Sequence, residues 1–415
     1  SANKKLQSGW QMTTNEIALS YPATYTSAQR QRLIELAEKA SLADGTQVHV
    51  SGTIAEPAAA GLDYLSRFGS DKETTVLVYD LGGGTFDLAL VALYPKGRTN
   101  GDGDYYYDIL AVDGLEDVGG GEFDEIMYQL IEQKLQVPLN PSHKAALRAE
   151  AEKIKKDLTF DAYADAEVLY NNEYLTVRVT REEFETASRE LLMRTIEATK
   201  KMFERHSNQK PETIILTGGA SQMPMVKRAL EEAFPEYKGD EMKHKEDKIQ
   251  ISNPSRAIAD GAARYGTAEA MNDIAEKAEA ASVVQTRVGY DLGIRFYHSV
   301  DDESGYISTY IPAGTPIPYQ AAYQNSTTLH EDQRYSGFTV YEANKAHPDS
   351  EQVAEDYTEI MKVSLDHGRE VPKGTRNESR LCIDKLGVLT IEAREADHPE
   401  KPIKRTVELK NLSKS

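Results

Sequence analysis

The chain has 415 residues, of which 40% are hydrophobic and 28% charged, so it is long and apolar enough to bury the cores of two or more domains. Its formal net charge of −19 argues against a nucleic-acid backbone as partner, and no run of 18 uncharged apolar residues is present to span a membrane. The single cysteine, Cys382, excludes an internal disulfide framework and a cysteine-rich metal site. It is compatible with a reducing compartment, and we expect a cytoplasmic protein.

The first elements alternate between strand and helix. Residues 14–21 predict a strand that ends before Pro22, and residues 28–41 predict a helix with Ser27 as its N-cap. A short strand is expected at 48–50. It leads to an alanine-rich helix that starts at Glu56, where the following proline suits a first helical turn.

Two apolar β-type stretches within residues 76–91 flank a turn of three consecutive glycines, Gly82, Gly83 and Gly84. Glycines without a Cβ allow several backbone N–H groups to point at one anion. A tight glycine-rich hairpin without a ligand is the alternative for the glycines taken alone.

Polar side chains border this turn on both sides. Asp80 ends the first stretch, and Thr85 and Asp87 open the second. A carboxylate at a strand end can hold a hydrated Mg²⁺, which usually keeps most of its waters. The threonine adds a hydroxyl, so the pattern indicates a site for magnesium and phosphate.

The alternation of strands and helices continues to about residue 270 and is typical of an α/β domain. The expected elements are a strand at 106–112, helices at 122–135, 143–158 and 181–206, a buried strand at 214–216 and a small-residue helix at 257–268.

The pattern changes near residue 281. Residues 269–287 predict a helix end and a linker, and residues 288–410 show short β-rich runs with frequent Pro and Gly, which predicts an all-β domain, most simply a sandwich. The clearest runs are 306–311, 337–341, 359–365 and 388–393.

The string Asp-Leu-Gly-Gly-Gly-Thr-Phe-Asp at 80–87 resembles the second phosphate loop of the actin-like ATPases, and is closest to the 70-kDa heat-shock chaperones. Similar motifs occur along nearly the whole chain. The resemblance implies an α/β actin-like ATPase domain, incomplete at its N-terminus, followed by an all-β peptide-binding sandwich. We place these parts at 1–272 and 288–415, with a helix end and linker at 273–287.

The resemblance assigns catalytic roles to four side chains. Asp80 matches the metal-side aspartate, which would hold Mg²⁺ through water, and Asp87 matches the base-side aspartate. Thr85 matches a phosphate-contacting threonine. Glu56, in a segment similar to Asn-Glu-Pro-Thr-Ala-Ala, would lie near the attacking water.

The resemblance also implies contacts to ATP or ADP outside the hairpin. They are Gly119 and Gly120 at a helix start, Glu152, Lys155, Lys156 and Thr159 on an adenosine-binding helix, and Gly218 and Gly219 in a turn. Gln222 replaces a base-stacking arginine and Gly121 a ribose-contacting glutamate. Because lost contacts of this kind cost about 1 kcal/mol each, we expect weaker nucleotide binding than is usual in the family.

In the β-rich half, the resemblance implies a cleft for extended apolar peptides of unfolded clients, gripped partly through the main chain. By alignment, the residues near this cleft are Phe296, Tyr297, Phe338 and Val340, although sandwich core is the simpler interpretation of each. The segment 282–288 lacks the leucines and acids of the family's docking linker, so we expect it not to dock. Co-chaperones are possible further partners.

The family's first phosphate loop and its catalytic lysine precede the segments matched here, so we expect little ATP hydrolysis from this chain alone. It is then either a fragment or a chaperone-like interaction protein or co-chaperone that does not hydrolyse ATP. A different actin-like protein, such as a sugar kinase or filament protein, is a third alternative, which the β-rich half disfavours.

Overall fold

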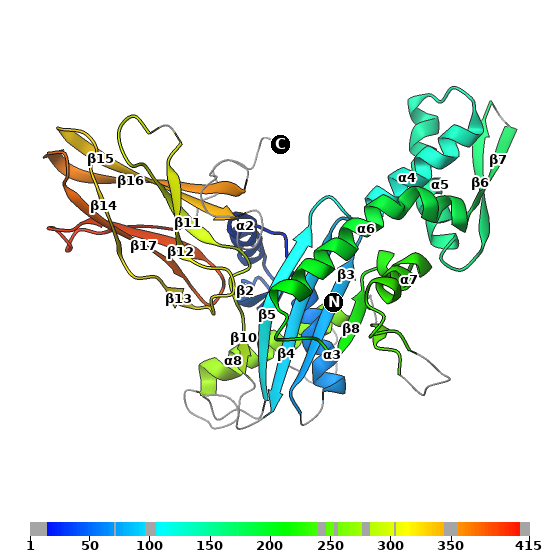
Figure 1. Ribbon diagram of the computed structural model, residues 1–415, viewed down its shortest axis with the longest axis horizontal. Coiled ribbons are helices and arrows are strands. Elements are labelled where there is room, and N and C mark those ends of the chain that lie inside the picture. The colour runs from blue at the N-terminus through cyan, green and yellow to red at the C-terminus, as the bar shows by residue number, and fades with distance from the viewer. Residues whose placement is uncertain are drawn as a thin grey trace.

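The computed structural model describes residues 15–69, 72–95, 105–171, 173–239, 246–252, 256–275, 283–302, 304–343 and 356–406. An α/β part occupies the centre and right of Figure 1, and an all-β part, from β11 to the C-terminal strands, lies at its left. No helix in these ranges is both long and apolar enough to cross a membrane.

A six-stranded sheet with the order β10-β5-β4-β3-β8-β9 forms the centre of the α/β part. β3, β4 and β5 are antiparallel, whereas β8 pairs parallel to β3, β9 to β8 and β10 to β5. The strand bounds are β3 Thr74–Leu81, β4 Phe86–Pro95, β5 Tyr105–Leu115, β8 Thr213–Thr217, β9 Ile249–Ile251 and β10 Val283–Gln285.

The apolar run of β3 is continuous because both faces of the sheet are covered. Leu77 and Tyr79 pack into a core with helices α4 to α7, whereas Val76 and Val78 pack into a second core with α3 and α8. The helices are α4 Gly120–Leu135, α5 Pro141–Asp157, α6 Arg181–Arg205, α7 Pro224–Ala233, α3 Glu56–Phe68 and α8 Ala257–Ala275, and the hairpin β6 Tyr163–Tyr170 with β7 Glu173–Thr180 packs beside α5.

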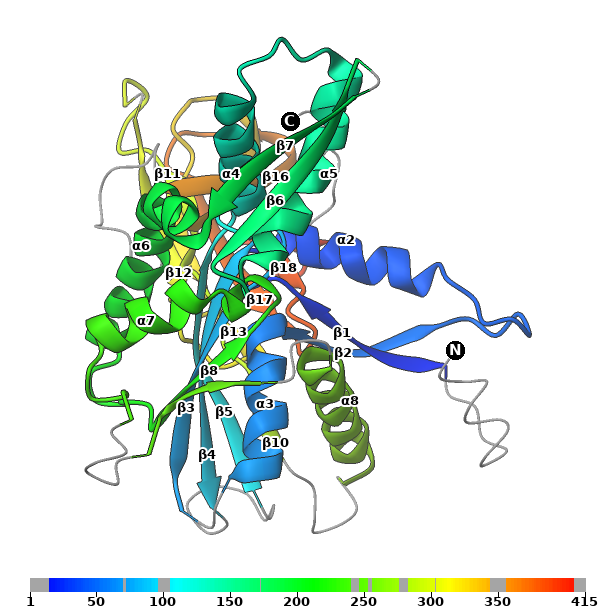
Figure 2. The ribbon, with the colours of Figure 1, turned by 90° about the vertical axis from the view of Figure 1, so that its right-hand side faces the viewer.

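Helices α3 and α8 lie side by side (Figure 2), and a glycine permits their contact. A Cβ added at Gly261 would lie 1.8 Å from the carbonyl oxygen of Ala59, so only glycine fits there. A small parallel sheet of β1 (Glu16–Tyr21) and β2 (His49–Ala55), connected by α2 (Ser27–Glu38), leads into α3. The order strand, helix, parallel strand, helix recurs from β8 to α8.

Two antiparallel sheets form the all-β part, with the orders β12-β11-β15-β16 and β13-β17-β18-β19, and β14 pairs with β17. Ile294 and Val340 of the first sheet and Leu381 and Ile391 of the second are fully buried in one shared core. The bounds are β11 Leu292–Phe296, β12 Tyr306–Ile311, β13 Tyr319–Gln320, β14 Gln324–Thr327, β15 Gln333–Ala343, β16 Tyr357–Val371, β17 Arg376–Ile383, β18 Leu389–Glu395 and β19 Ile403–Thr406.

The segment that connects the two parts is docked, which corrects our expectation for residues 282–288. Its strand β10 extends the main sheet beside β5. Immediately afterwards, Arg287 makes a bidentate contact of 2.8 and 2.5 Å with the buried carboxylate of Asp108 on β5. Backbone pairing requires no particular side chain, so the missing leucines did not prevent docking.

A second contact between the parts involves the start of α2. The buried carboxylate of Glu342 on β15 accepts hydrogen bonds from the backbone N–H (2.9 Å) and the hydroxyl (3.2 Å) of Ser27. The helix N-cap is Thr26, not Ser27 as expected, and its side chain forms a capping box with Gln29.

Candidate functional site

The glycine turn between β3 and β4 is tight and exposed. The N–H of Gly82 donates to the carbonyl of Thr85 at 3.0 Å. Gly83 and Gly84 are exposed, and a Cβ on either would meet no atom within 4 Å. The turn therefore presents bare backbone to solvent.

Asp80 and Asp87 face each other across the hairpin, since they are paired in the β3–β4 register. Both are buried, at 4% and 2% exposure. The Thr85 hydroxyl donates to Asp87 Oδ2 at 2.6 Å, and the nearby backbone N–H groups of Ala23 and Thr24 act to lower the pKa of this carboxylate against the larger effect of burial. The contribution of the last two residues was not predicted, because backbone donors leave no sequence signal.

Glu56, at the first turn of α3, brings a third carboxylate to this place. Burial, the charge of Asp87 and the charge of Glu56 raise the pKa of Asp80 to about 7. Burial is also the main cause that raises the pKa values of Asp87 and Glu56. We call Glu56, Asp80 and Asp87 the carboxylate cluster. Its members repel one another, so the cluster favours either a proton or a cation.

The residues fit a hydrated magnesium ion. Asp87 Oδ1 and Thr217 Oγ1 are buried and have no hydrogen-bond partner among the described residues, and Thr217 is the register partner of Asp80 on β8. No group of three or more His, Cys, Asp or Glu side chains in the described part of the chain is arranged to hold a metal directly. A hydrated Mg²⁺, which usually keeps several waters, does not require three such side chains as direct ligands.

Gly218 approaches the carboxylate cluster from β8. Its φ is +80°, and an added Cβ would lie 2.4 Å from Asp80 Oδ1. Next to it, Gly219 has open space around it, and the buried hydroxyl of Ser221 accepts from the N–H of Leu81 at 3.0 Å. Ser221, which the sequence analysis did not single out, thus ties this turn to the end of β3.

The start of α4 contacts the glycine turn itself. The N–H groups of Gly120 and Gly121 donate to the carbonyls of Gly82 and Gly83 at 2.9 and 2.8 Å. A Cβ on Gly119 would lie 2.5 Å from the carbonyl carbon of Gly84. These glycines therefore hold the turn in place, and the Gly120 N–H is already engaged within the protein.

The four residues predicted on the adenosine side are separated by the structure. Lys155 is buried and contacts Asp124 at 2.7 Å and the Gly120 carbonyl at 2.8 Å. Glu152 and Lys156 form an exposed ion pair at 2.6 Å. Sequence reasoning missed Asp124, although it stands in the same Gly-Gly-Gly-Glu-Phe-Asp segment as the helix glycines.

Thr159 lies beside Lys155 at a small cavity that Met223 also lines. The volume of this cavity is about 10 Å³, which is the space of about one water molecule. A nucleoside at this position requires these side chains to move apart.

The four residues predicted for peptide binding lie in different environments. Phe338 and Val340 are buried in the sandwich core, at 3% and 0% exposure. Phe296 packs against that core and against the ring of Tyr306. Tyr297 is 43% exposed and lies beneath the Arg295 guanidinium. Only the last of the four is exposed.

A family model described as Hsp70 protein matches residues 4–414. Because the match covers almost all of the chain, the protein belongs to the Hsp70 family. Membership supports a chaperone-type function, and the family generally binds ATP or ADP with magnesium and the unfolded peptides of client proteins. The α/β part followed by an all-β part is compatible with this family.

Proposed function

We propose that this protein is a chaperone whose α/β part, an actin-like domain, binds the phosphates of ADP or ATP with Mg²⁺ at the β3–β4 hairpin. The carboxylate cluster carries the proposal. Asp80 and Asp87 would hold the hydrated ion, Thr85 and the bare glycines would contact phosphate, and Glu56 would order a water molecule. Phosphoryl transfer depends on such positioning and charge stabilisation.

The electrostatics supports a cation more than a purely structural role. Three carboxylates share a small region, and the buried lysine Lys155 is directed away from them, at Asp124 and at a backbone carbonyl. A divalent cation would relieve the repulsion that raises the pKa of Asp80. The orphan Asp87 Oδ1 would accept from a water molecule bound to that ion.

Calorimetry with ADP, in buffers with and without Mg²⁺, tests the site. We expect weak, magnesium-dependent binding that Asp80→Ala abolishes. Asp165→Asn is the matched control, because Asp165 is an exposed carboxylate paired with Arg178 on the remote β6–β7 hairpin. Equal affinities of the wild type and Asp80→Ala would reject the assignment.

We propose further that the sandwich binds extended apolar peptides. The support is the aromatic group at the β11–β12 end, where Phe296 contacts the rings of Tyr306 and Tyr310 and Tyr297 is exposed. Clients would be unfolded segments rich in apolar side chains.

Fluorescence anisotropy of the full chain with a leucine-rich heptapeptide tests this second part. We expect a Kd near 1 μM, which corresponds to about −8 kcal/mol. Tyr297→Ala should weaken binding, whereas Tyr174→Ala, which removes another exposed tyrosine, on β7, should leave it unchanged. Loss of peptide binding in both variants, or in neither, would contradict the placement of the cleft.

A further inference from the structure

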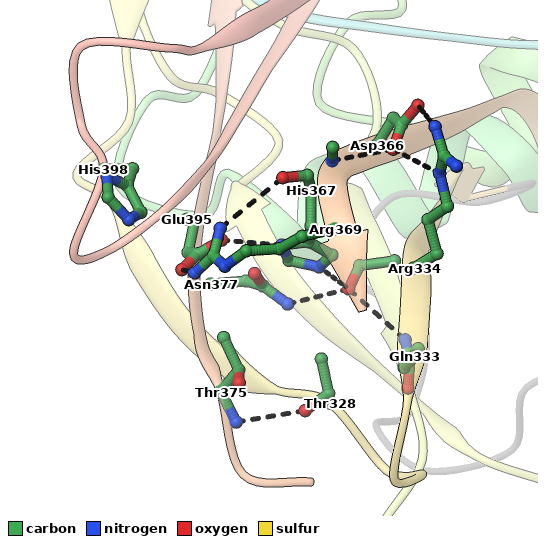
Figure 3. Close-up of polar contacts among 12 residues, drawn as sticks. Thr328, Gln333, Arg334, Asp366, His367, Arg369, Thr375, Asn377, Glu395 and His398 are labelled. Atoms are coloured by element: carbon green, nitrogen blue, oxygen red, sulfur yellow. Dashed lines mark hydrogen bonds and ion pairs between the residues drawn. The ribbon is translucent and has the colours of Figure 1, made fainter. Parts of the chain in front are cut away.

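One end of the sandwich holds a polar cluster, buried except for Arg369, that neither the nucleotide site nor the peptide cleft uses. Figure 3 shows His367, Arg369 and Glu395 together, with Asn377 beside them. They come from β16, β17 and β18, and Ser336 of β15 completes the group. The cluster thus joins both sheets where the apolar core ends.

Three of these side chains form a linear relay. The Ser336 hydroxyl lies 3.0 Å from His367 Nε2, and His367 Nδ1 lies 2.9 Å from Glu395 Oε2. Ser336 is 6% exposed, the His367 side chain 0% and Glu395 6%. This is the order of nucleophile, base and orienting carboxylate found in serine hydrolases, and such a set is recognised by geometry rather than by sequence position.

The neighbours determine where the protons lie. Burial acts to raise the pKa of Glu395, but hydrogen bonds from Arg369 and His367 outweigh it and lower the pKa, so the carboxylate is ionised and His367 Nδ1 carries a proton. The Ser336 oxygen already accepts from Asn377 Nδ2 at 2.9 Å and from Gln333 Nε2 at 3.4 Å. Its own proton is therefore directed at His367 Nε2, which acts as the base.

Asn377 supplies a second, independent observation. It is 2% exposed, and its Oδ1 has no hydrogen-bond partner among the residues that the structure describes. Unpaired buried acceptors are uncommon in proteins. This oxygen lies on the residue that contacts the nucleophile, where it can accept from a water molecule or from the alcohol of a substrate.

We propose that Ser336, His367 and Glu395 form a second reactive site, separate from the chaperone function, which accepts the acyl group of small activated carboxylic esters. Ser336 Oγ attacks the ester carbonyl and its proton passes to His367 Nε2. The bond to the leaving alcohol breaks, and the alcohol takes that proton, which leaves an acyl-serine. Water then attacks the acyl carbon through the same base, releases the carboxylic acid and restores the hydroxyl.

Asn377 Nδ2 already lies 2.9 Å from the nucleophile, so it can donate to the oxyanion that forms on the attached carbonyl. Access runs past Gln333, which is partly exposed at the start of β15 and contacts Ser336 directly. Its displacement opens the path to the hydroxyl.

Labelling with a fluorophosphonate probe, followed by peptide mapping, tests the proposal on the full chain. We expect covalent label on Ser336, none in Ser336→Ala, and a rate about 100-fold lower in His367→Ala, the lower end of what a general base supplies. Gln333→Ala should raise the labelling rate several-fold. Hydrolysis of 4-nitrophenyl acetate should follow the same order.

Two matched variants separate reactivity from fold. Ser379→Ala removes another buried serine of the same sandwich, which contacts the Tyr310 hydroxyl at 2.7 Å, and His398→Ala removes an exposed histidine. Neither should change labelling. Glu395 is a positioning residue, so Glu395→Gln should lower the rate and move the pH midpoint of labelling downward, and Glu395→Asp should restore part of the rate.

Circular dichroism identifies variants that fail to fold. The test of the proposal itself uses the wild type and Gln333→Ala, so it stands even if the other variants do not fold. Absence of label on Ser336 in both of these proteins, from mildly acidic to mildly alkaline pH, would overturn the proposal. Equal labelling of the wild type and Ser336→Ala would overturn it too.

Discussion

The two sides of the candidate nucleotide site differ in how their charges are balanced. On the phosphate side, Asp80 and Asp87 are buried next to each other and next to Glu56, and their pKa values are raised. On the predicted adenosine side, Lys155 is paired with Asp124 and Glu152 with Lys156. A helix face allows residues four apart to pair, whereas a hairpin register places like charges opposite each other.

The comparison teaches that charge balance separates groups that await a ligand from groups that hold the fold. An unbalanced buried cluster is costly unless something binds it. A pair of opposite charges in contact is already neutralised, so its presence requires no ligand. We therefore expect mutations on the phosphate side to change ligand binding and pH dependence, and mutations on the other side to change mainly stability.

The largest effect should come from Asp80→Asn in magnesium-free buffer. The folded-state pKa of Asp80 is about 7 against an ordinary value of 3.8, so the unfolded chain loses its proton first as the pH rises, and the folded state loses stability between these values. At about 1.4 kcal/mol per pKa unit, the variant should gain about 4 kcal/mol in free energy of unfolding above pH 7 and little near pH 4.

Urea denaturation at the two pH values measures this gain. Asp165→Asn, which removes an exposed and paired carboxylate, should show no such gain. A gain of equal size for Asp80→Asn at both pH values would show that the carboxylate cluster is not strained by charge.

Lys155→Met should lower the free energy of unfolding by about 2 kcal/mol, because it leaves Asp124 without its partner. This expected loss is smaller than that for a fully buried ion pair, because the Asp124 side chain is 25% exposed and water screens its charge. The double variant Lys155→Met/Asp124→Leu should recover part of the loss in the same urea measurement. If Lys155→Met weakens ADP binding without any loss of stability, Lys155 belongs with the ligand-binding groups.

Magnesium binding near pH 7 should release about half a proton per ion, since Asp80 is half protonated at its pKa. Calorimetry in two buffers with different ionisation enthalpies gives the number of protons. The release should vanish in Asp80→Asn and persist in Glu152→Gln.

The smallest effect should come from Glu152→Gln itself. Its exposed pair with Lys156 spans one helical turn, and such solvent-screened pairs contribute very little to the free energy of unfolding. Urea denaturation should detect no more than this, and ADP affinity should change less than threefold. A larger loss of ADP affinity would mean that this helix face binds the nucleotide after a rearrangement.

The sequence predicted well those elements whose periodicity is local. The helix expected at 181–206 is α6 (Arg181–Arg205), and the run at 306–311 is β12. The hairpin β6–β7 was not predicted, and no element was assigned between the helices expected at 143–158 and 181–206. Two of the three buried positions of β6, Ala164 and Ala166, are alanines, which give a weak β-signal. The strand expected at 48–50 continues to Ala55, past Gly52, which weakens the β-signal.

For the site, the motif at 80–87 predicted two carboxylates beside the glycine turn, and the structure brings Glu56 to them from helix α3. The pairing of Lys155 with Asp124 was not predictable from spacing, since it joins α5 to α4. The relay of Ser336, His367 and Glu395 also depends on the contact of strands β15, β16 and β18, and no local sequence pattern indicates it. Contacts between residues far apart in the sequence determine which polar groups already have hydrogen-bond partners within the protein. These contacts cannot be inferred from the local pattern of a single sequence.

The pairing of β10 with β5 affects the solubility of the α/β part when that part is produced separately from the sandwich. β5 is a long strand at the side of the main sheet, and residues 283–285 cover the backbone at 106–108. Unpaired sheet edges of this kind recruit other chains. The α/β part cut off before residue 283 should therefore self-associate, and the same part extended through Arg287, whose contact with Asp108 anchors the covering strand, should stay monomeric in analytical ultracentrifugation.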